Sequence, residues 1–264
     1  MERRISIIGY GAIGKDLCDR LLDLGFQVTV LLAPDVLPPA QVSGDLQFVH
    51  TVSEWLKPRP DLVIEAAGQA ALIQIAPAVI AEGIDLLAAS VGVAGNAPFM
   101  DSISQLSQKT SARLIFPTGA VGGIDYLEVV AAAKDLTVTY TSRKPVAAWS
   151  AELAEMGHDT TTLRDEIVLF EGDAVEAARR YPRNLNAGLT IALATGIERT
   201  SVRVIADPSV KLNTHEINVQ SAFGDAYMRF ANLPSPHNPK TSAITAESLV
   251  AAVRSCMKTR PMNT

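Results

Sequence analysis

The chain has 264 residues, 48% hydrophobic and 19% charged, a composition typical of a soluble globular protein with a sizeable core and too apolar for a disordered chain. Its 23 Lys and Arg against 28 Asp and Glu give a formal net charge of −5, which argues against a general binder of nucleic acid or anionic membranes. Two cysteines are too few for a disulfide framework or a cysteine-based zinc site, and no apolar run is long enough to cross a membrane. We therefore expect a cytoplasmic protein.

The first 120 residues alternate short aliphatic runs with turns and with longer segments of helical periodicity, such as Ile13–Leu24. Strands and helices that alternate at this length predict an α/β fold, a doubly wound parallel sheet of the Rossmann type with right-handed crossovers. Pro77 predicts a start, kink or break in the helix that follows Gly68. The predicted strands are residues 4–8, 28–32, 47–50, 62–65, 86–89 and 114–116.

The pattern changes after Pro117. Residues 136–142 alternate threonine with valine and tyrosine, which is typical of a half-buried strand in a mixed or antiparallel sheet. We expect a first domain over residues 1–118, a second α+β domain on a mixed or antiparallel sheet over 119–240, and a C-terminal helix within 241–264 that packs back on the first domain. The other predicted elements are strands at 167–170, 202–206, 216–222 and 227–231 and helices at 126–133, 174–180, 185–194 and 245–255.

The turn G-Y-G-A-I-G directly follows the first strand and opens the first helix. Gly9 permits the tight turn, Gly11 lets the backbone approach a pyrophosphate, and Gly14 lets the helix pack closely on the strand. The pyrophosphate would then bind N–H groups at the helix start, around Ala12 and Ile13. The pattern alone also fits a glycine turn without a nucleotide, but its strand–turn–helix context predicts binding of NAD or NADP.

The choice between NAD and NADP is expected to lie at the end of the second strand, where an acid would bind the ribose 2′-hydroxyl and repel a 2′-phosphate. That strand ends in Leu32-Ala33-Pro34, and the first acid, Asp35, follows the proline, with no arginine nearby. The sequence therefore selects neither cofactor strongly and favours use of both, or of NAD.

Two further turns follow strands of the predicted sheet, Glu65-Ala66-Ala67-Gly68 and Ser90-Val91-Gly92. Ligands of doubly wound sheets bind beyond the carboxyl ends of the strands. Ala67 and Gly68 are small enough to pass beneath a ribose and nicotinamide, and the same logic makes Ser90 and Val91 candidates. Each segment also fits a plain turn between strand and helix, so the pattern leaves both interpretations open.

One of the four histidines stands apart. His215 shares a period-2 face with Ile217 and Val219, so it is buried if they are. A buried imidazole needs a hydrogen-bond partner or a chemical task, so both a satisfied core histidine and a functional one fit the pattern. The others are interpreted as surface, packing or loop residues: His50, His158 and His237.

Other polar residues carry two interpretations each. Asn184 or Asn186 can cap the helix that follows, and an asparagine amide can also bind a carboxamide such as that of nicotinamide. Arg143 and Lys144 end a strand, either as a solvated turn or as positive charge for an anionic substrate. The sequence shows no His/Glu metal constellation, so we predict no metal, and it has no G-x-S-x-G elbow.

Together these segments resemble the L-aspartate dehydrogenase family, in family order and over nearly the whole chain. The first glycine turn is generic. The second glycine turn, the Asn-x-Asn helix, the histidine strand and the Asn-Pro-Lys-Thr-Ser segment are specific in combination. The matching stretches are residues 8–14, 65–68, 119–125, 143–145, 181–186, 204–208, 213–217 and 238–242.

The resemblance implies NAD(P)-dependent oxidation of L-aspartate to iminosuccinate, which hydrolyses to oxaloacetate and ammonia, and the reverse reductive amination. Iminosuccinate also feeds pyridine nucleotide biosynthesis. The resemblance further implies an active-site role for His215, cofactor contacts for Ala120 and Asn186, and a homodimer. The candidates for binding the two substrate carboxylates are Arg143, Lys144 and Lys240.

Two departures from the family pattern leave the substrate more open than the fold. Ala187 stands where many members carry valine, and the segment 195–199 is about one residue shorter than usual. One alternative is a dehydrogenase or imine reductase for another small amino or keto acid. Another is a nucleotide-binding sensor without turnover, whose mark would be the loss of His215 or Asn186; both are present.

Overall fold

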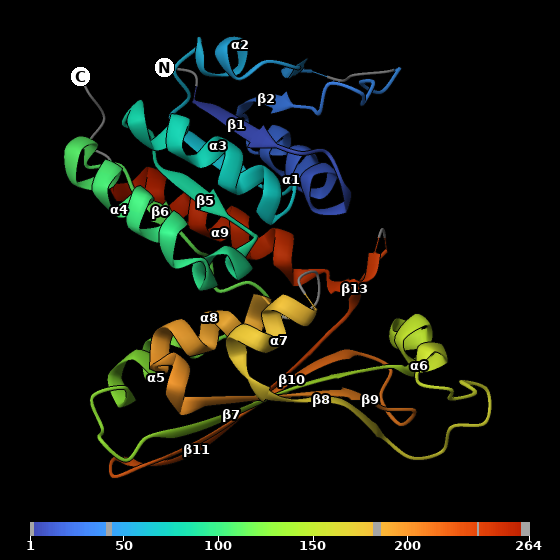
Figure 1. Cartoon of the computed structure of the whole chain (residues 1–264). Helices are drawn as coiled ribbons and strands as arrows, with labels where there is room; N and C mark the ends of the chain where they lie inside the picture. Colours follow the sequence, from blue (N-terminus) through green and yellow to red (C-terminus); the bar gives the residue numbers. More distant parts are fainter. Residues whose placement is uncertain (1–2, 41–43, 182–185, 237, 260–264) are drawn as a thin grey trace. The chain divides into compact units, whose positions relative to one another are not determined.

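The computed structural model describes residues 3–40, 44–181, 186–236 and 238–259. The chain divides into two compact units (Figure 1). Unit 1 comprises Met1–Pro117 with Thr245–Thr264, and unit 2 comprises Thr118–Ile244.

Unit 1 is built on a parallel sheet with the strand order β3-β2-β1-β4-β5-β6. The sheet confirms the predicted doubly wound α/β class, and each strand boundary lies within one residue of its prediction. The strands form aliphatic runs without alternation because both faces of the sheet are covered. They are β1 (Arg4–Ile8), β2 (Gln27–Leu31), β3 (Leu46–Val49), β4 (Leu62–Glu65), β5 (Leu86–Ala88) and β6 (Leu114–Ile115).

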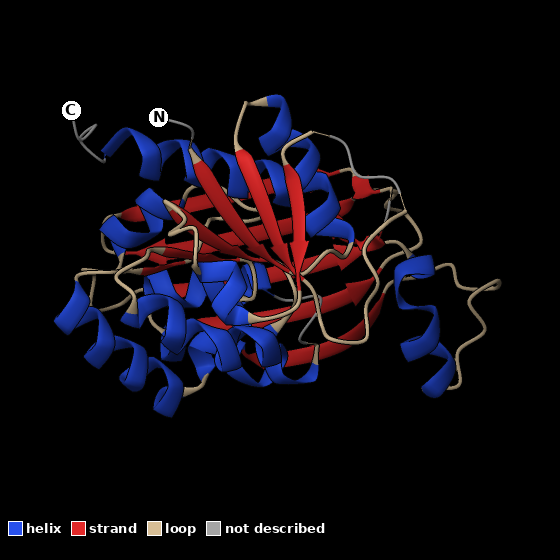
Figure 2. Cartoon of the chain, turned by 90° about the horizontal axis from the view of Figure 1, so that it is seen from above, coloured by secondary structure: helices blue, strands red, loops and turns tan. Residues whose placement is uncertain are grey.

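Helices pack on both faces of this sheet (Figure 2). On one face, Leu17 of α1 and Leu249 of α9 belong to the same buried cluster as Ile7 of β1. On the other, Leu72 of α3 and Phe99 of α4 pack with the neighbouring strand residues. The helices of unit 1 are α1 (Ala12–Asp23), α2 (Val52–Leu56), α3 (Gln69–Ala81), α4 (Ala97–Thr110) and α9 (Ile244–Thr259), with a 3₁₀ turn η1 (Val91–Gly95).

The predictions that a helix starts or breaks at Pro77 are wrong, because α3 continues through this proline, whereas a kink there stays a prediction. Proline removes one helical hydrogen bond and crowds the preceding turn. Here four residues of α3 itself are fully buried: Leu72, Ala76, Val79 and Ile80. That burial outweighs the local cost.

Unit 2 is built on a mixed sheet with the order β11-β10-β7-β9-β8, which confirms the predicted sheet type. Only the β7–β9 pair is parallel; the other neighbouring strands run antiparallel. The strands are β7 (Thr137–Lys144), β8 (Ile167–Asp173), β9 (Thr200–Ala206), β10 (Asn213–Ser221) and β11 (Gly224–Asn232).

Helices α5 (Ile124–Val130), α7 (Ala174–Arg180) and α8 (Asn186–Thr195) lie on one face of this sheet (Figure 1). We call it the covered face and the opposite one the open face. Along β10, His215, Ile217 and Val219 are buried on the covered face, whereas Asn218 and Gln220 are exposed. The smaller elements, which the sequence did not predict, are α6 (Ser150–Glu155), η2 (Val146–Trp149), η3 (Ile197–Arg199), β12 (Pro234–Ser235) and β13 (Asn238–Ser242).

Candidate active site

The glycine turn of unit 1 has the shape of a dinucleotide cradle. Gly9 has a φ of +91°, and a Cβ there would lie 2.7 Å from the Cβ of Ala67. A Cβ on Gly14 would collide with the carbonyl oxygen of Gly9. A Cβ on Gly11 would meet no atom within 4 Å. Gly9 and Gly14 are therefore needed by the fold. Gly11 keeps open space before the start of α1, at Ala12, where a pyrophosphate fits.

The turns after β4 and β5 lie at the same edge of the sheet, because Glu65 is in register with Ile8 of β1 and with Ala88 of β5. This edge is the point where the strand order reverses, the usual ligand site of doubly wound sheets. Ala67 and Gly68 begin one turn, and Ser90 and Val91, both buried, form the other.

Glu65 is a residue to which sequence analysis assigned no role. Its side chain is fully buried, and its carboxylate accepts hydrogen bonds from the N–H groups of Ala67, Gly68 and Ser90 and from the Ser90 hydroxyl. An acidic residue ending a buried strand was the available signal, because such a side chain requires several donors.

The second glycine turn lies in unit 2, between Thr118 and α5. The Asn232 side-chain amide on β11 donates a 2.8 Å hydrogen bond to the Ala120 carbonyl, which fixes the position of this turn. Gly122 faces the ring of Phe230, where a Cβ would lie 3.2 Å from Cε1. Asn232 was not predicted, because its pairing with Ala120 spans more than a hundred residues.

His215 is buried on the covered face, with 3% of its surface exposed. Its Nδ1 lies 2.7 Å from the hydroxyl of Tyr140 on β7, and the two share a hydrogen bond. The Tyr140 ring packs beneath α8, where a Cβ on Gly188 would come within 3.0 Å of it. No described residue forms a hydrogen bond with His215 Nε2. One ring nitrogen is thus fixed, and the other has capacity for a ligand.

Burial keeps His215 neutral. Burial lowers its pKa from 6.5 to about 3, with the positive charge of Lys144 as a second cause. Burial raises the pKa of the Tyr140 phenol, which therefore keeps its proton at neutral pH. His215 and Tyr140 are thus both uncharged before the reaction, and His215 can then accept one proton.

Lys144 shares the covered face with His215. Its side chain is 2% exposed, and its Nζ lies 5.3 Å from the centre of the buried Trp149 ring. An ammonium group can form a charge-assisted hydrogen bond with a carboxylate.

Arg143, the preceding residue, points to the open face. Its guanidinium pairs with Glu166, with Asp207 at 2.7 Å and with Glu216 at 3.4 Å. Partial burial alone would lower the pKa of Arg143, but hydrogen bonds to Glu166 and Asp207 outweigh it and raise the pKa. The structure thus separates two adjacent cations that the sequence had grouped together.

The other predicted residues are distributed as follows. Asn186 is the first residue of α8, the helix that covers Tyr140, and its side chain is half-buried. Lys240 lies on β13, and its side chain is outside the described residues, as are Asn184 and His237. His50 is exposed, and its Nδ1 is 3.2 Å from the Ala33 carbonyl at the end of β2.

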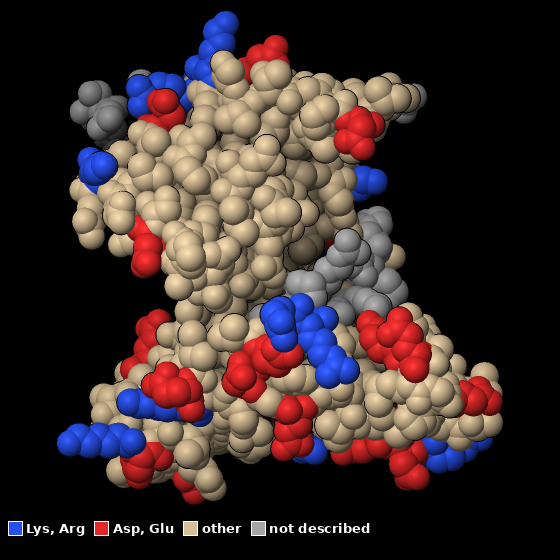
Figure 3. Space-filling view, viewed as in Figure 1, with Lys and Arg blue, Asp and Glu red and all other residues tan. Residues whose placement is uncertain are grey.

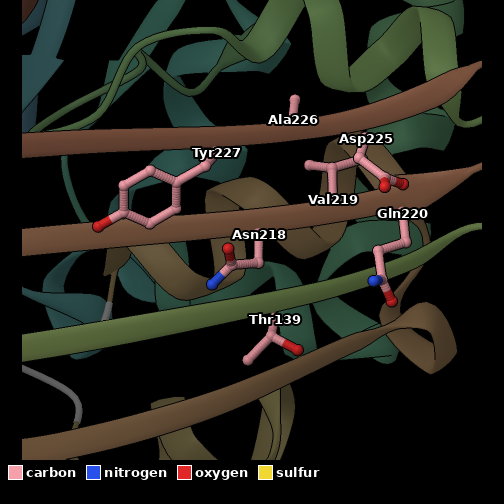
Figure 4. Close-up of a pocket in the computed structure, with 7 residues that line it drawn as sticks. All are labelled: Thr139, Asn218, Val219, Gln220, Asp225, Ala226 and Tyr227. Carbon is pink, nitrogen blue, oxygen red and sulfur yellow. The ribbon is translucent and has the colours of Figure 1, made fainter.

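A separate depression of about 390 Å³ lies on the open face (Figure 4). It contains neither His215 nor Lys144, and its side chains come from β7, β10 and β11. Its lining is formed by Thr139, Asn218, Val219, Gln220, Asp225, Ala226 and Tyr227.

The surface charge and the metal-binding capacity of the chain limit the ligands that it can bind. On the face shown in Figure 3, Lys and Arg side chains are interspersed with Asp and Glu. Within the part of the chain that the structure describes, no group of three His, Cys, Asp or Glu side chains could hold a metal ion.

Both units match known families. Residues 125–256 match the family described as "Aspartate dehydrogenase, C-terminal". Residues 9–117 match the family described as "Homoserine dehydrogenase, NAD binding domain".

Relatives that match nearly the whole chain include L-aspartate dehydrogenases. L-aspartate dehydrogenase 2 of Bordetella pertussis is 42% identical over 259 residues, covering 96% of this chain and 97% of the relative. The L-aspartate dehydrogenase of Methanosarcina barkeri is 38% identical, with coverages of 95% and 96%. The crystal structure of aspartate dehydrogenase from Thermotoga maritima has a TM-score of 0.74 at 25% identity and covers both chains fully. A hyperthermophilic archaeal homoserine dehydrogenase in complex with NADPH shares the fold alone, with a TM-score of 0.57, 11% identity and 99% coverage of each chain.

Proposed function

The chain belongs to the L-aspartate dehydrogenase family, and we infer that it interconverts L-aspartate with iminosuccinate, and hence with oxaloacetate and ammonia, using NAD or NADP. It is an NAD(P)-dependent oxidoreductase acting on an amino acid. The observation that carries this assignment beyond the family match is the buried, neutral His215, whose Nε2 has no hydrogen-bond partner among the described residues and which lies beside the charge of Lys144.

Unit 1 provides most of the proposed cofactor-binding residues. We propose that Gly9, Gly11, Ala12, Ile13 and Gly14 hold the pyrophosphate. Further contacts come from Ala67 and Gly68 after β4, from Ser90 and Val91 after β5, and, as the family resemblance implies, from Ala120 and Asn186 of unit 2. When bound, the nicotinamide ring accepts or delivers the hydride. The protein's share of the work is orientation and electrostatics.

His215 is the proposed proton carrier. With Nδ1 held by Tyr140, Nε2 can accept a proton from the substrate amine or from the water that attacks the imine. A substrate carboxylate beside Lys144 offsets the positive charge that is the second cause of the low pKa of His215, while burial, the larger cause, is unchanged.

Lys144 is the proposed partner of one substrate carboxylate, because it shares the covered face with His215. Arg143 is assigned a structural role instead, because three carboxylates of its own chain surround its guanidinium. Lys240 remains a candidate for the second carboxylate from its place in the family motif.

The test is oxidation of NADH or NADPH, followed by absorbance, with oxaloacetate and ammonia. Controls omit ammonia or replace oxaloacetate with pyruvate or 2-oxoglutarate. Turnover that needs both ammonia and oxaloacetate supports the proposal and ranks the two cofactors in the same experiment. A preference for pyruvate would favour a dehydrogenase for another small acid, since a pocket for two carboxylates rejects a monocarboxylate strongly.

We further propose a homodimer that associates through the open face. This face carries both signs of charge, with Arg143, Arg203 and Arg229 near Glu171 and Glu216. A face that carries both signs of charge can pair with the same face of a second copy turned about a two-fold axis. Light scattering coupled to gel filtration should give twice the chain mass of 28.1 kDa, and a monomer mass would contradict the proposal.

A cytoplasmic location is also proposed. No helix in the described part of the chain has the length and hydrophobicity needed to cross a membrane. Cys18 and Cys256 form no disulfide, as is usual in a reducing compartment. Fractionation of cells that produce the tagged protein should recover it in the cytosolic fraction.

A further inference from the structure

Glu65 connects two turns that differ in sequence position by about 25 residues. Its Oε1 accepts hydrogen bonds from the N–H groups of Ala67 and Gly68, at 2.7 and 2.6 Å, and from the Ser90 hydroxyl at 2.9 Å. Its Oε2 accepts the Ser90 N–H at 3.0 Å. A single carboxylate therefore fixes the turn after β4 and the turn after β5 relative to each other.

The hydrogen bonds to the Glu65 carboxylate are charge-assisted. The carboxylate is fully buried, and its four partners are neutral N–H and O–H donors rather than a lysine or arginine. Charge-assisted bonds of this type are shorter and stronger than neutral ones, and each donor would be left unsatisfied without its acceptor. A fold that needed only to close two turns could do so without burying a charge, so the carboxylate indicates a demand for exact placement of these turns.

The two turns lie at the ligand edge of the sheet. Glu65 is in register with Ile8, the last residue before the glycine turn, and Ala67 packs directly against Gly9. In doubly wound sheets one half of a dinucleotide lies over each half of the sheet. The adenosine half belongs over β1 to β3, and the nicotinamide half over β4 to β6.

We propose that Glu65 is a positioning residue for the nicotinamide half of the cofactor, acting through Ala67, Gly68 and Ser90. This inference rests on the proposed cofactor-dependent function. It predicts that loss of the carboxylate weakens binding of the whole dinucleotide far more than binding of its adenosine diphosphate half.

Glu65→Gln is the sharpest variant, because it keeps the size and the Oε1 acceptor but presents an NH₂ group to the Ser90 N–H. Asp85→Asn is the matched control. Asp85 is also a buried carboxylate of unit 1 with backbone and side-chain bonds to Arg113, but it lies just before β5, at the opposite edge of the sheet.

Binding of NADH and of ADP is measured by isothermal titration calorimetry for the parent and both variants, together with the melting temperature. We expect Glu65→Gln to weaken NADH binding at least tenfold and to change ADP binding less than threefold. Asp85→Asn should lower the melting temperature but leave both affinities within threefold. Ser90→Ala, which removes one donor and keeps the carboxylate, should weaken NADH binding about threefold, and it replaces Glu65→Gln if that variant does not fold.

Unchanged NADH binding in Glu65→Gln, or equal losses for NADH and ADP, would overturn the role of Glu65. A parent chain that binds neither NADH nor NADPH would instead overturn the proposed function. The two failures are therefore distinct.

Discussion

The two units present their functional groups in different ways. In unit 1 the groups are mostly backbone N–H and small residues at the carboxyl ends of parallel strands, and the key feature is space, as at Gly11. In unit 2 they are large side chains on one face of a sheet, where His215, Tyr140 and Lys144 come together across two antiparallel strands. A site of the first kind depends on backbone shape and on the few side chains, such as Glu65, that fix it. A site of the second kind depends on which face each residue occupies.

The largest effect is expected at the side-chain site. His215→Ala removes the only group assigned to proton transfer, so kcat should fall by about 10³, within the usual range for general acid–base residues. NADH affinity should stay within about threefold of the parent. Steady-state kinetics with oxaloacetate and ammonia, combined with NADH titration, tests both. Comparable kcat in mutant and parent would remove the assigned role.

Arg143 and Lys144, which are adjacent on β7, test this difference most directly, because both are cations but their side chains lie on opposite faces of the sheet. Lys144→Met should lower kcat/KM for oxaloacetate about a hundredfold, since a charge-assisted bond of roughly 2–3 kcal/mol is lost. Arg143→Met should instead destabilise the protein by about 2 kcal/mol, because the partly buried carboxylates of Asp207 and Glu216 lose their shared guanidinium partner. Urea unfolding and substrate kinetics on both variants separate the two outcomes. A reversed pattern, with Arg143→Met controlling substrate use, would overturn the assignment of faces.

The sequence predicts the backbone site of unit 1 better than the side-chain site of unit 2. The glycine turn and all six parallel strands were predicted, because each depends on local rules of turn geometry and on runs of aliphatic residues. Burial of His215 was predicted from the alternation of β10, whereas its partner Tyr140 was not, because strand pairing sets that contact. Arg143 and Lys144 looked equivalent in the sequence, since neither residue type nor spacing shows which face of β7 the helices cover.

Backbone shape in unit 1 gives the next prediction. Gly11→Ala adds a Cβ where no atom lies within 4 Å, so the fold should be unaffected while the Cβ occupies the space for the pyrophosphate. NADH and ADP affinity should both fall about tenfold, a loss of about 1.4 kcal/mol. Gly14→Ala is the contrast, because its Cβ would collide with the Gly9 carbonyl and should cost about 2 kcal/mol of stability. If Gly11→Ala binds both ligands as the parent does, the cradle is wrongly placed.

The last prediction concerns stability and pH at the side-chain site. His215 has a pKa of about 3 in the folded protein and about 6.5 when unfolded, because burial and the charge of Lys144 disfavour the imidazolium. Between these values the unfolded chain binds the additional proton, so the free energy of unfolding falls as pH falls, with a slope from this group of about 1.4 kcal/mol per pH unit near pH 5. His215→Gln should remove that slope, and Lys144→Met should retain most of it, since burial is the larger cause. Urea unfolding of the three proteins from pH 7 to pH 4 measures the slopes. Parallel curves for parent and His215→Gln would mean that the buried imidazole accepts a proton as readily as an exposed one, and the neutral base assigned to this site would then lose its physical support.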